Sequence, residues 1–234
     1  MKRSDSVQEQ VYLQLRDEII HMERLPGTTM SVYDVSDQMG VSRTPVREAF
    51  IRLAAESLVE IAPQRKTRIS RIDFGRVRQE RFLRTALELA ATERFLEMAT
   101  AECFVRMREI IARQCEAVQQ GDPKRLLAYD DAFHGVIFEV VRQQLSWNII
   151  HDMSGHERRV RMMMVCDSGD AQSVISEHKA LLDAFEAGDA ARATQCCGEH
   201  LEKLIAQEDV LRRQYPDYFS EKVEKAPQSS GIIT

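Results

Sequence analysis

Apolar side chains near the start of the chain recur at the interval of an α-helix. The apolar positions of residues 7–22 lie three or four residues apart, with mostly polar residues between them. Such positions share one helical face, so this stretch predicts an amphipathic helix. The chain should then turn at Pro26-Gly27, because proline and glycine interrupt regular structure. The apolar positions are Val7, Val11, Leu15, Ile19 and Met22.

A short second helix is predicted from residue 31. Ser31 is a suitable N-cap with Asp34 at the third helical position, the arrangement of a capping box. Met30 and Val35 stand where a hydrophobic staple forms. Gly40 suits the left-handed residue that ends a helix. The second helix should therefore end at about residue 39.

A third helix is predicted directly afterwards. Thr44 is a good N-cap and Pro45 suits the first helical position, where its missing N–H costs nothing. Val46, Phe50 and Leu53 would form the buried stripe of this helix. Two short helices joined by Gly-Val-Ser-Arg indicate a helix-turn-helix. Residues 58–61 and 68–70 read as two strands of a β-hairpin, the wing.

The remainder of the chain is helical in pattern. No strand-type alternation occurs after residue 73, and breaks fall at Gly121-Asp122-Pro123, at residues 167–170 and at Gly188-Asp189. The expected fold is mostly α: a winged helix-turn-helix of three helices and a β-hairpin over residues 1–72, an all-α bundle over 73–222, and a flexible tail over 223–234. The predicted bundle helices are 74–98, 102–119, 123–142, 144–165, 171–187 and 189–213.

Charge is distributed unevenly between these two parts. The whole chain carries −5, yet residues 42–72 contain seven Arg or Lys against three Glu, a net +4 that leaves −9 for the rest. A basic patch on an acidic body is typical of a DNA-reading module joined to another domain. Arg43 and Arg47 lie four residues apart at the start of the third helix, where an arginine can contact guanine in the major groove. Lys66 and its neighbours at the wing would meet the minor groove or backbone.

Ordinary surface ion pairs are the alternative interpretation of these arginines, for example with Glu48. The cap, the turn, the wing and the charge patch agree with one another, which favours nucleic-acid binding. No apolar run is long enough to span a membrane or serve as a signal peptide, so the protein is expected to be cytoplasmic, with no membrane partner. Five cysteines without a paired spacing predict reduced thiols.

A second group of residues has the chemistry of metal ligands. Asp130 and His134 are four residues apart and share a helical face, while His178 and His200 lie on two later predicted helices. One carboxylate and three imidazoles suit zinc, nickel, manganese or iron. From spacing alone, hydrogen-bonded core histidines are the simpler interpretation.

The motifs resemble a known family. Leu25-Pro26-Gly27, the segment GVSRTPVREA at 40–49 and Arg52-Leu53 look like the winged helix of GntR regulators, and the remainder resembles the helical FCD domain of the FadR subfamily, together over about residues 7–215. Many members carry Ser-Glu at Tyr33-Asp34, glycine at Ser57 and glycine at Lys66. The resemblance and the charge pattern together give the expected DNA-contacting residues Ser42, Arg43, Thr44, Arg47, Arg65, Lys66 and Thr67.

The same resemblance bears on the second group. Metal-binding FCD domains carry an Asp-x-x-x-His pair and two further histidines, which match Asp130, His134, His178 and His200 here. Arg84 and Glu88 match an Arg-x-x-x-Glu pair whose arginine faces the ligand pocket, although such a pair is also an ordinary i,i+4 salt bridge. The resemblance thus implies a small carboxylate effector bound by Arg84 and the metal.

The leading functional hypothesis is a homodimeric regulator, more specifically a repressor, that reads an inverted-repeat DNA operator under control of the effector. Two other hypotheses stay open at this stage. One is a metal-dependent hydrolase in which Asp131 or Glu177 serves as base near a metal-bound water. The other is a constitutive architectural DNA-binding dimer whose bundle only joins two copies.

Overall fold

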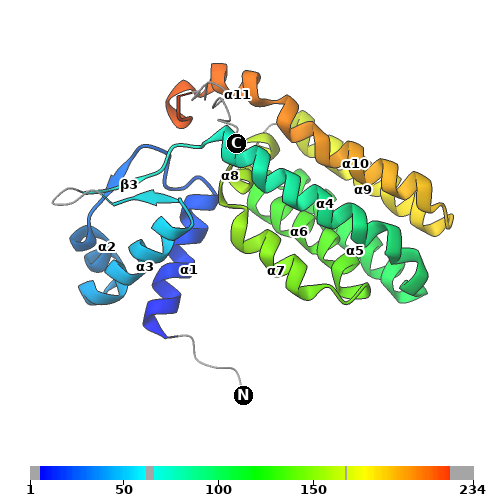
Figure 1. Ribbon diagram of the computed structural model, residues 1–234, viewed down its shortest axis with the longest axis horizontal. Coiled ribbons are helices and arrows are strands. Elements are labelled where there is room, and N and C mark those ends of the chain that lie inside the picture. Colours follow the sequence, from blue (N-terminus) through cyan, green and yellow to red (C-terminus); the bar gives the residue numbers. More distant parts are fainter. Residues whose placement is uncertain (1–5, 62–65, 167, 222–234) are drawn as a thin grey trace, which may run out of the picture.

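The computed structural model describes residues 6–61, 66–166 and 168–221, and it divides into a small head and a long helical bundle (Figure 1). The head holds α1 (Val7–Ile20), α2 (Val32–Met39) and α3 (Arg43–Ala55). Its antiparallel sheet has the order β1-β3-β2, formed by Thr29–Met30, Thr67–Ile69 and Val59–Glu60. The predicted winged helix-turn-helix is confirmed. The strand β1 was missed, because its two residues are ordered only by pairing with the distant β3.

Local signals account for most helix ends in the head. Ser31 accepts a hydrogen bond from the Asp34 N–H at 3.0 Å, and Gly40 is left-handed with φ of 65°. The predicted N-cap of α3, Thr44, was wrong: the N-cap is Ser42 and the helix begins at Arg43, two residues before the predicted Pro45. Pro45 is then the third helical residue, and it is tolerated because the first N–H groups of a helix have no intrahelical acceptor.

The bundle consists of helices only, as predicted, among the residues described. Two predicted helices are each broken into two. The stretch 144–165 is interrupted at Ser154, whose backbone leaves the helical region. The stretch 189–213 is interrupted at Gln207, whose N–H bonds to Leu204 three residues back. The bundle helices are α4 (Phe74–Met98), α5 (Ala101–Gln119), α6 (Pro123–Val140), α7 (Gln144–Met153), α8 (Gly155–Val165), α9 (Ser168–Glu186), α10 (Ala190–Ala206) and α11 (Glu208–Gln214).

The linker between head and bundle is fastened by the C-terminal end of the described chain. The Ile72 N–H donates to the Tyr218 carbonyl at 2.8 Å, and the Ser220 N–H donates to the Ile72 carbonyl at 3.0 Å. The ring of Phe74 stacks on that of Phe219 with centroids 5.1 Å apart. Residues 215–220 therefore hold the junction between the two parts. The expected flexible tail, 223–234, lies outside the described residues.

Helix α8 lies between the head and the rest of the bundle (Figure 1). Its first residue, Gly155, packs so closely on Leu58 of the head that an added Cβ would lie 2.8 Å from Leu58 Cδ2. Leu58 is fully buried and has little room to move. The break at Ser154 thus lets α8 start in contact with the head.

Gly155→Ala is expected to lower the free energy of unfolding by about 1–3 kcal/mol, because the new methyl group overpacks this contact. Gly198→Ala in α10 is the matched control. Its Cβ would lie 3.9 Å from Leu89, an ordinary contact, so removing a helical glycine should raise stability by roughly 0.5–1 kcal/mol. Urea unfolding monitored by circular dichroism measures both. A neutral Gly155→Ala would contradict the close packing of α8 on the head.

Candidate metal centre and nucleic-acid interface

Three helices of the bundle bring the four predicted metal-binding residues together. Asp130 and His134 come from α6, His178 from α9 and His200 from α10. One potential ligand atom from each lies within 4.8 Å of the others. Asp130, His134 and His178 are buried, and His200 is partly buried. The i,i+4 spacing on α6 is the only part of this cluster that the sequence placed on one face.

The three imidazoles meet through the same ring nitrogen. His134 Nε2 lies 3.2 Å from His178 Nε2 and 3.3 Å from His200 Nε2. His178 Nε2 also lies 3.5 Å from Asp130 Oδ1. The Nε2 atoms and a carboxylate oxygen therefore surround one point. Such a donor set fits a divalent transition metal.

The opposite nitrogen of each ring faces an oxygen acceptor. His134 Nδ1 lies 2.6 Å from Glu88 Oε2, at ion-pair distance but without the geometry of a hydrogen bond. His178 Nδ1 lies 3.0 Å from Gln114 Oε1, and His200 Nδ1 lies 2.6 Å from Glu177 Oε2. An Nδ1–H that donates to these oxygens leaves the Nε2 lone pair directed at the centre. Three lone pairs facing one point repel one another unless a cation lies between them, so the residues fit a metal.

Protonation states at neutral pH agree with this arrangement. Burial lowers the pKa of His178 well below its usual range, against the raising effect of Asp130. Burial also lowers the pKa of His200, although its hydrogen bond to Glu177 raises it. Burial alone would raise the pKa of Asp130, but Arg161 and the neighbouring histidines bring it well below its usual value. Neutral imidazoles and an ionised carboxylate are the forms that bind metal ions.

Arg84 lies next to this cluster and is 2% exposed. Its Nε donates to Glu88 Oε1 at 2.5 Å and its Nη1 to Glu157 Oε1 at 3.3 Å. Its Nη2 is 3.8 Å from Asp130 Oδ2 and has no hydrogen-bond acceptor among the described residues. The pair with Glu88 is therefore buried and belongs to a network, unlike an exposed i,i+4 salt bridge. A buried donor without a partner needs an explanation, and a ligand is one.

A pocket with a cavity volume of about 70 Å³ opens beside the cluster. Positive and ligating groups come together in its wall: Arg81, Arg84, Asp130, Arg161, His200 and Lys203.

Sequence reasoning missed some of these neighbours. Gln114 and Arg161 were not assigned to the site, because both are far from the histidines in the sequence. Glu177 was considered only as a base for a hydrolase. It instead accepts from His200 Nδ1 and contacts Lys203. A hydrogen-bond acceptor on a neighbouring helix produces no periodic pattern in the sequence, so these contacts could not be predicted.

The predicted DNA-contacting residues on α3 form one exposed surface. Ser42, Arg43, Thr44 and Arg47 are all exposed, and the Arg43 guanidinium lies 5.2 Å from the centre of the Tyr33 ring. Neither arginine forms an ion pair within the described part of the chain, and Glu48 instead accepts from Gln8 at 2.7 Å. The proposed pairing with Glu48 is therefore not observed.

The wing contributes less to this surface than expected. Lys66 is exposed, but Thr67 is buried because it pairs with Met30 and faces the head core. Thr67 is thus not available for DNA contact, which corrects the sequence interpretation. Arg65 lies outside the described residues. Ser57 is left-handed, with φ of 62°, which gives a physical reason for glycine at this position in many GntR proteins.

A winged helix-turn-helix joined to a helical domain with a pocket in its bundle is the architecture of a two-domain transcription regulator. Residues 7–69 match the family described as bacterial regulatory proteins, gntR family, and residues 81–203 match the FCD domain. The HTH-type transcriptional repressor RspR of Escherichia coli K12 is 30% identical over 216 residues, which cover 92% of this chain and 95% of that protein. The chain therefore belongs to the GntR family of bacterial transcription regulators, with an FCD domain consistent with the FadR subfamily.

Solved structures share the fold. E. coli McbR/YncC superimposes with a TM-score of 0.76 at 22% identity, covering 90% of this chain and 99% of that chain. A putative GntR regulator from Rhodococcus sp. RHA1 gives a TM-score of 0.75 at 23% identity, covering 87% and 97%. The families and relatives are transcription regulators and not enzymes, which rejects the hydrolase hypothesis. Among the residues described, no helix is long and apolar enough to cross a membrane.

Proposed function

We propose that the protein is a homodimeric repressor whose affinity for an inverted-repeat operator is set by a small carboxylate bound at a divalent metal in the FCD domain. The observation that carries this proposal is the convergence of three Nε2 atoms, with a hydrogen-bond acceptor at Nδ1 of His178 and His200 and the Glu88 carboxylate beside Nδ1 of His134. The family supplies DNA binding. The metal, the effector and the dimer are the parts that need testing.

Asp130, His134, His178 and His200 would hold the metal, with Glu88, Gln114 and Glu177 orienting the rings. When bound, the metal supplies a positive charge and open coordination positions for an anionic ligand. Arg84 supplies the second contact, because its Nη2 has no acceptor and its guanidinium lines the pocket. A carboxylate placed there would accept from Arg84 and neutralise the metal charge.

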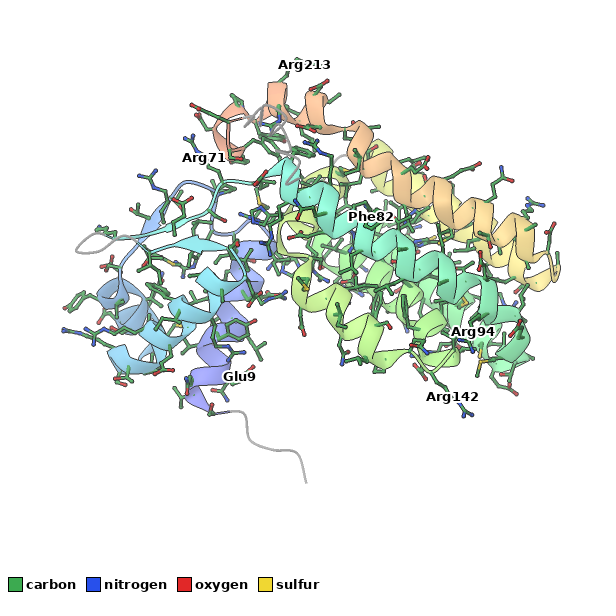
Figure 2. The ribbon with its side chains drawn as sticks, viewed as in Figure 1. Glu9, Arg71, Phe82, Arg94, Arg142 and Arg213 are labelled. Carbon is green, nitrogen blue, oxygen red and sulfur yellow. The ribbon has the colours of Figure 1, made fainter. Side chains whose placement is uncertain are left out.

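An exposed apolar face supports a homodimer. Leu145, Ile149 and Met153 repeat every four residues on α7, and all three are exposed. Phe82 on the adjoining helix α4 is 77% exposed and projects from the face of the bundle seen in Figure 2. Large apolar side chains exposed on two adjoining helices are typical of an interface between proteins. A two-fold axis through this face would present two heads to the two halves of an operator.

Helix α8 provides the physical connection between the site and the head. On one face, Glu157 accepts from Arg84, and Arg161 contacts the candidate ligand Asp130. On another face, Arg159 Nη1 donates to the Ser70 carbonyl at 2.7 Å, and His156 Nε2 lies 3.1 Å from the Ser57 carbonyl. A ligand that draws Arg161 or Glu157 toward itself would therefore shift the residues that hold the head.

Arg159→Met is expected to reduce the coupling between the two parts. In the wild-type protein, metal and effector should change operator affinity by about 5–150-fold. The variant removes the guanidinium bonds to Ser70, so this ratio should approach one. Zinc affinity should stay near that of wild type, because no hydrogen bond of Arg159 reaches a candidate metal ligand. Fluorescence anisotropy with a selected operator measures the ratio. Arg106→Met, on an exposed ion pair with Glu139, is the control and should couple normally.

The whole proposal is tested by selecting an operator from random duplexes with the purified protein. Its affinity is then measured with and without Zn²⁺ and with organic acids that shift the melting temperature. Saturation at 100 times the dissociation constant should add about 2.7 kcal/mol of stability. A protein that binds the operator equally under all conditions, and that no metal or acid stabilises, would instead be the constitutive architectural dimer.

A further inference from the structure

The wall of the pocket changes from polar to apolar about one helical turn away from the candidate metal ligands. On α6, Leu127 precedes Asp130 by three residues, and on α9, Val174 precedes His178 by four. On α10, Leu204 follows His200 by four. Helix α8 adds Met164, three residues after Arg161. Because one turn spans about 5.4 Å, these four residues form an apolar ring at a second level of the pocket.

Two polar side chains near this ring, Lys203 and Ser173, already have partners. Lys203 Nζ contacts Glu177 and donates to Ser173 Oγ at 3.1 Å. Glu177 is also held by His200, and Ser173 Oγ donates to Glu177 at 2.6 Å. A ligand hydroxyl placed beside the ring would have to compete with these bonds. An apolar ligand body would leave them intact.

The inner level holds charges that nearly balance without a ligand. Arg81, Arg84 and Arg161 are paired with three carboxylates, those of Glu88, Asp130 and Glu157. The positive charges of these three arginines are therefore matched by the negative charges of the three carboxylates. A bound divalent metal would add the charge that attracts one further carboxylate. A second carboxylate on the ligand would meet only Lys203 near the apolar level, and Lys203 already contacts Glu177.

A second hollow continues outward from the ring. It shares Met164, Asp170 and Gln207 with the first and is lined further by Met163, Val210, Leu211 and Tyr215. Apolar side chains therefore also lie beyond the ring, although polar side chains such as Gln207 and Gln214 make up much of this second wall.

We propose that the effector is an amphipathic monocarboxylate, with its carboxylate at the metal and Arg84 and an apolar body of four or more carbons passing the ring. This rests on the function proposed above and narrows its ligand class. Each methylene buried at the ring should strengthen binding about fourfold, which corresponds to ~0.8 kcal/mol. A hydroxyl buried there without a partner should weaken binding.

Isothermal titration of the zinc-loaded, full-length protein with acetate, butanoate, hexanoate, gluconate and succinate tests this. Affinity should rise roughly fourfold per carbon from butanoate to hexanoate. Gluconate, with the same chain length and five hydroxyls, should bind at least about tenfold more weakly than hexanoate. Hexanoate should lose most of its affinity when zinc is removed, which separates the pocket from adventitious apolar binding.

Val174→Thr keeps the side-chain shape and adds a hydroxyl to the ring. It should reduce the gain from butanoate to hexanoate while leaving acetate and zinc affinities unchanged. Val105→Thr, on the exposed face of α5, is the matched control and should behave as wild type. Tighter binding of gluconate or succinate, or an unchanged gain in Val174→Thr, would overturn the ligand class and leave carboxylate regulation standing. Failure of every carboxylate to bind the zinc-loaded protein would instead contradict the proposed function.

Discussion

His134→Ala is expected to lower zinc affinity by more than about 100-fold, because loss of an orienting partner alone costs 10–100-fold and this change removes a ligand. His134 has the central position, with its Nε2 within 3.3 Å of the Nε2 atoms of both other histidines. Competition with a fluorescent zinc chelator measures the affinity. Operator binding without metal should persist, because the polar contacts of His134 are all with bundle residues.

Two further variants make this result specific. Glu88→Gln retains an acceptor beside His134 Nδ1 but removes its charge, so its zinc affinity should fall between those of wild type and His134→Ala. His21→Ala removes a histidine on α1 that contacts Asp17, and it should bind zinc normally. Equal zinc affinity for His134→Ala and His21→Ala would identify the cluster as a packed core and not a metal site.

Arg47→Ala is expected to weaken operator binding by about 30-fold to 10⁴-fold. A bidentate contact between arginine and guanine is worth about 1–3 kcal/mol, and a symmetric dimer loses two of them. Arg47 is exposed on α3, with no ion pair to any described residue that would compete with DNA. Anisotropy titration against the selected operator measures the loss, and point changes in each half-site show which base pair loses its preference.

Arg94→Ala is the matched control for this substitution. Arg94 is exposed on α4 at the end of the bundle remote from the head (Figure 2), so its removal should change operator affinity by less than about threefold. Titrations at several salt concentrations distinguish a contact to a base from a contact to a phosphate. A phosphate contact would reduce the salt slope by about one per site without changing sequence preference. Indistinguishable binding by the two variants would remove Arg47 from the interface.

Local chemistry explains why much of the head was predictable. Ser31 and Gly40 act within one helical turn, and their capping roles depend on neighbours that the sequence displays. The same reasoning misplaced the start of α3 by two residues, because both Ser42 and Thr44 are possible caps and Pro45 tolerates either position. Strand β1 and the burial of Thr67 depend on pairing across 37 or more residues, which no local signal reports.

The sequence by itself determined the winged helix, the helical bundle and the residue types of a metal site. It did so because caps, periodicity and the family motifs are readable along one chain. Only the tertiary structure decided that Gln114 and Glu177 orient His178 and His200, and that Arg84 is buried with an unpartnered nitrogen. It also showed that two arginines of α8 face different parts of the protein. Arg161 contacts Asp130 at the site, and Arg159 donates to the Ser70 carbonyl beside the head. These contacts join side chains from different helices. They depend on how the helices pack against one another, which the order of residues in the sequence does not display.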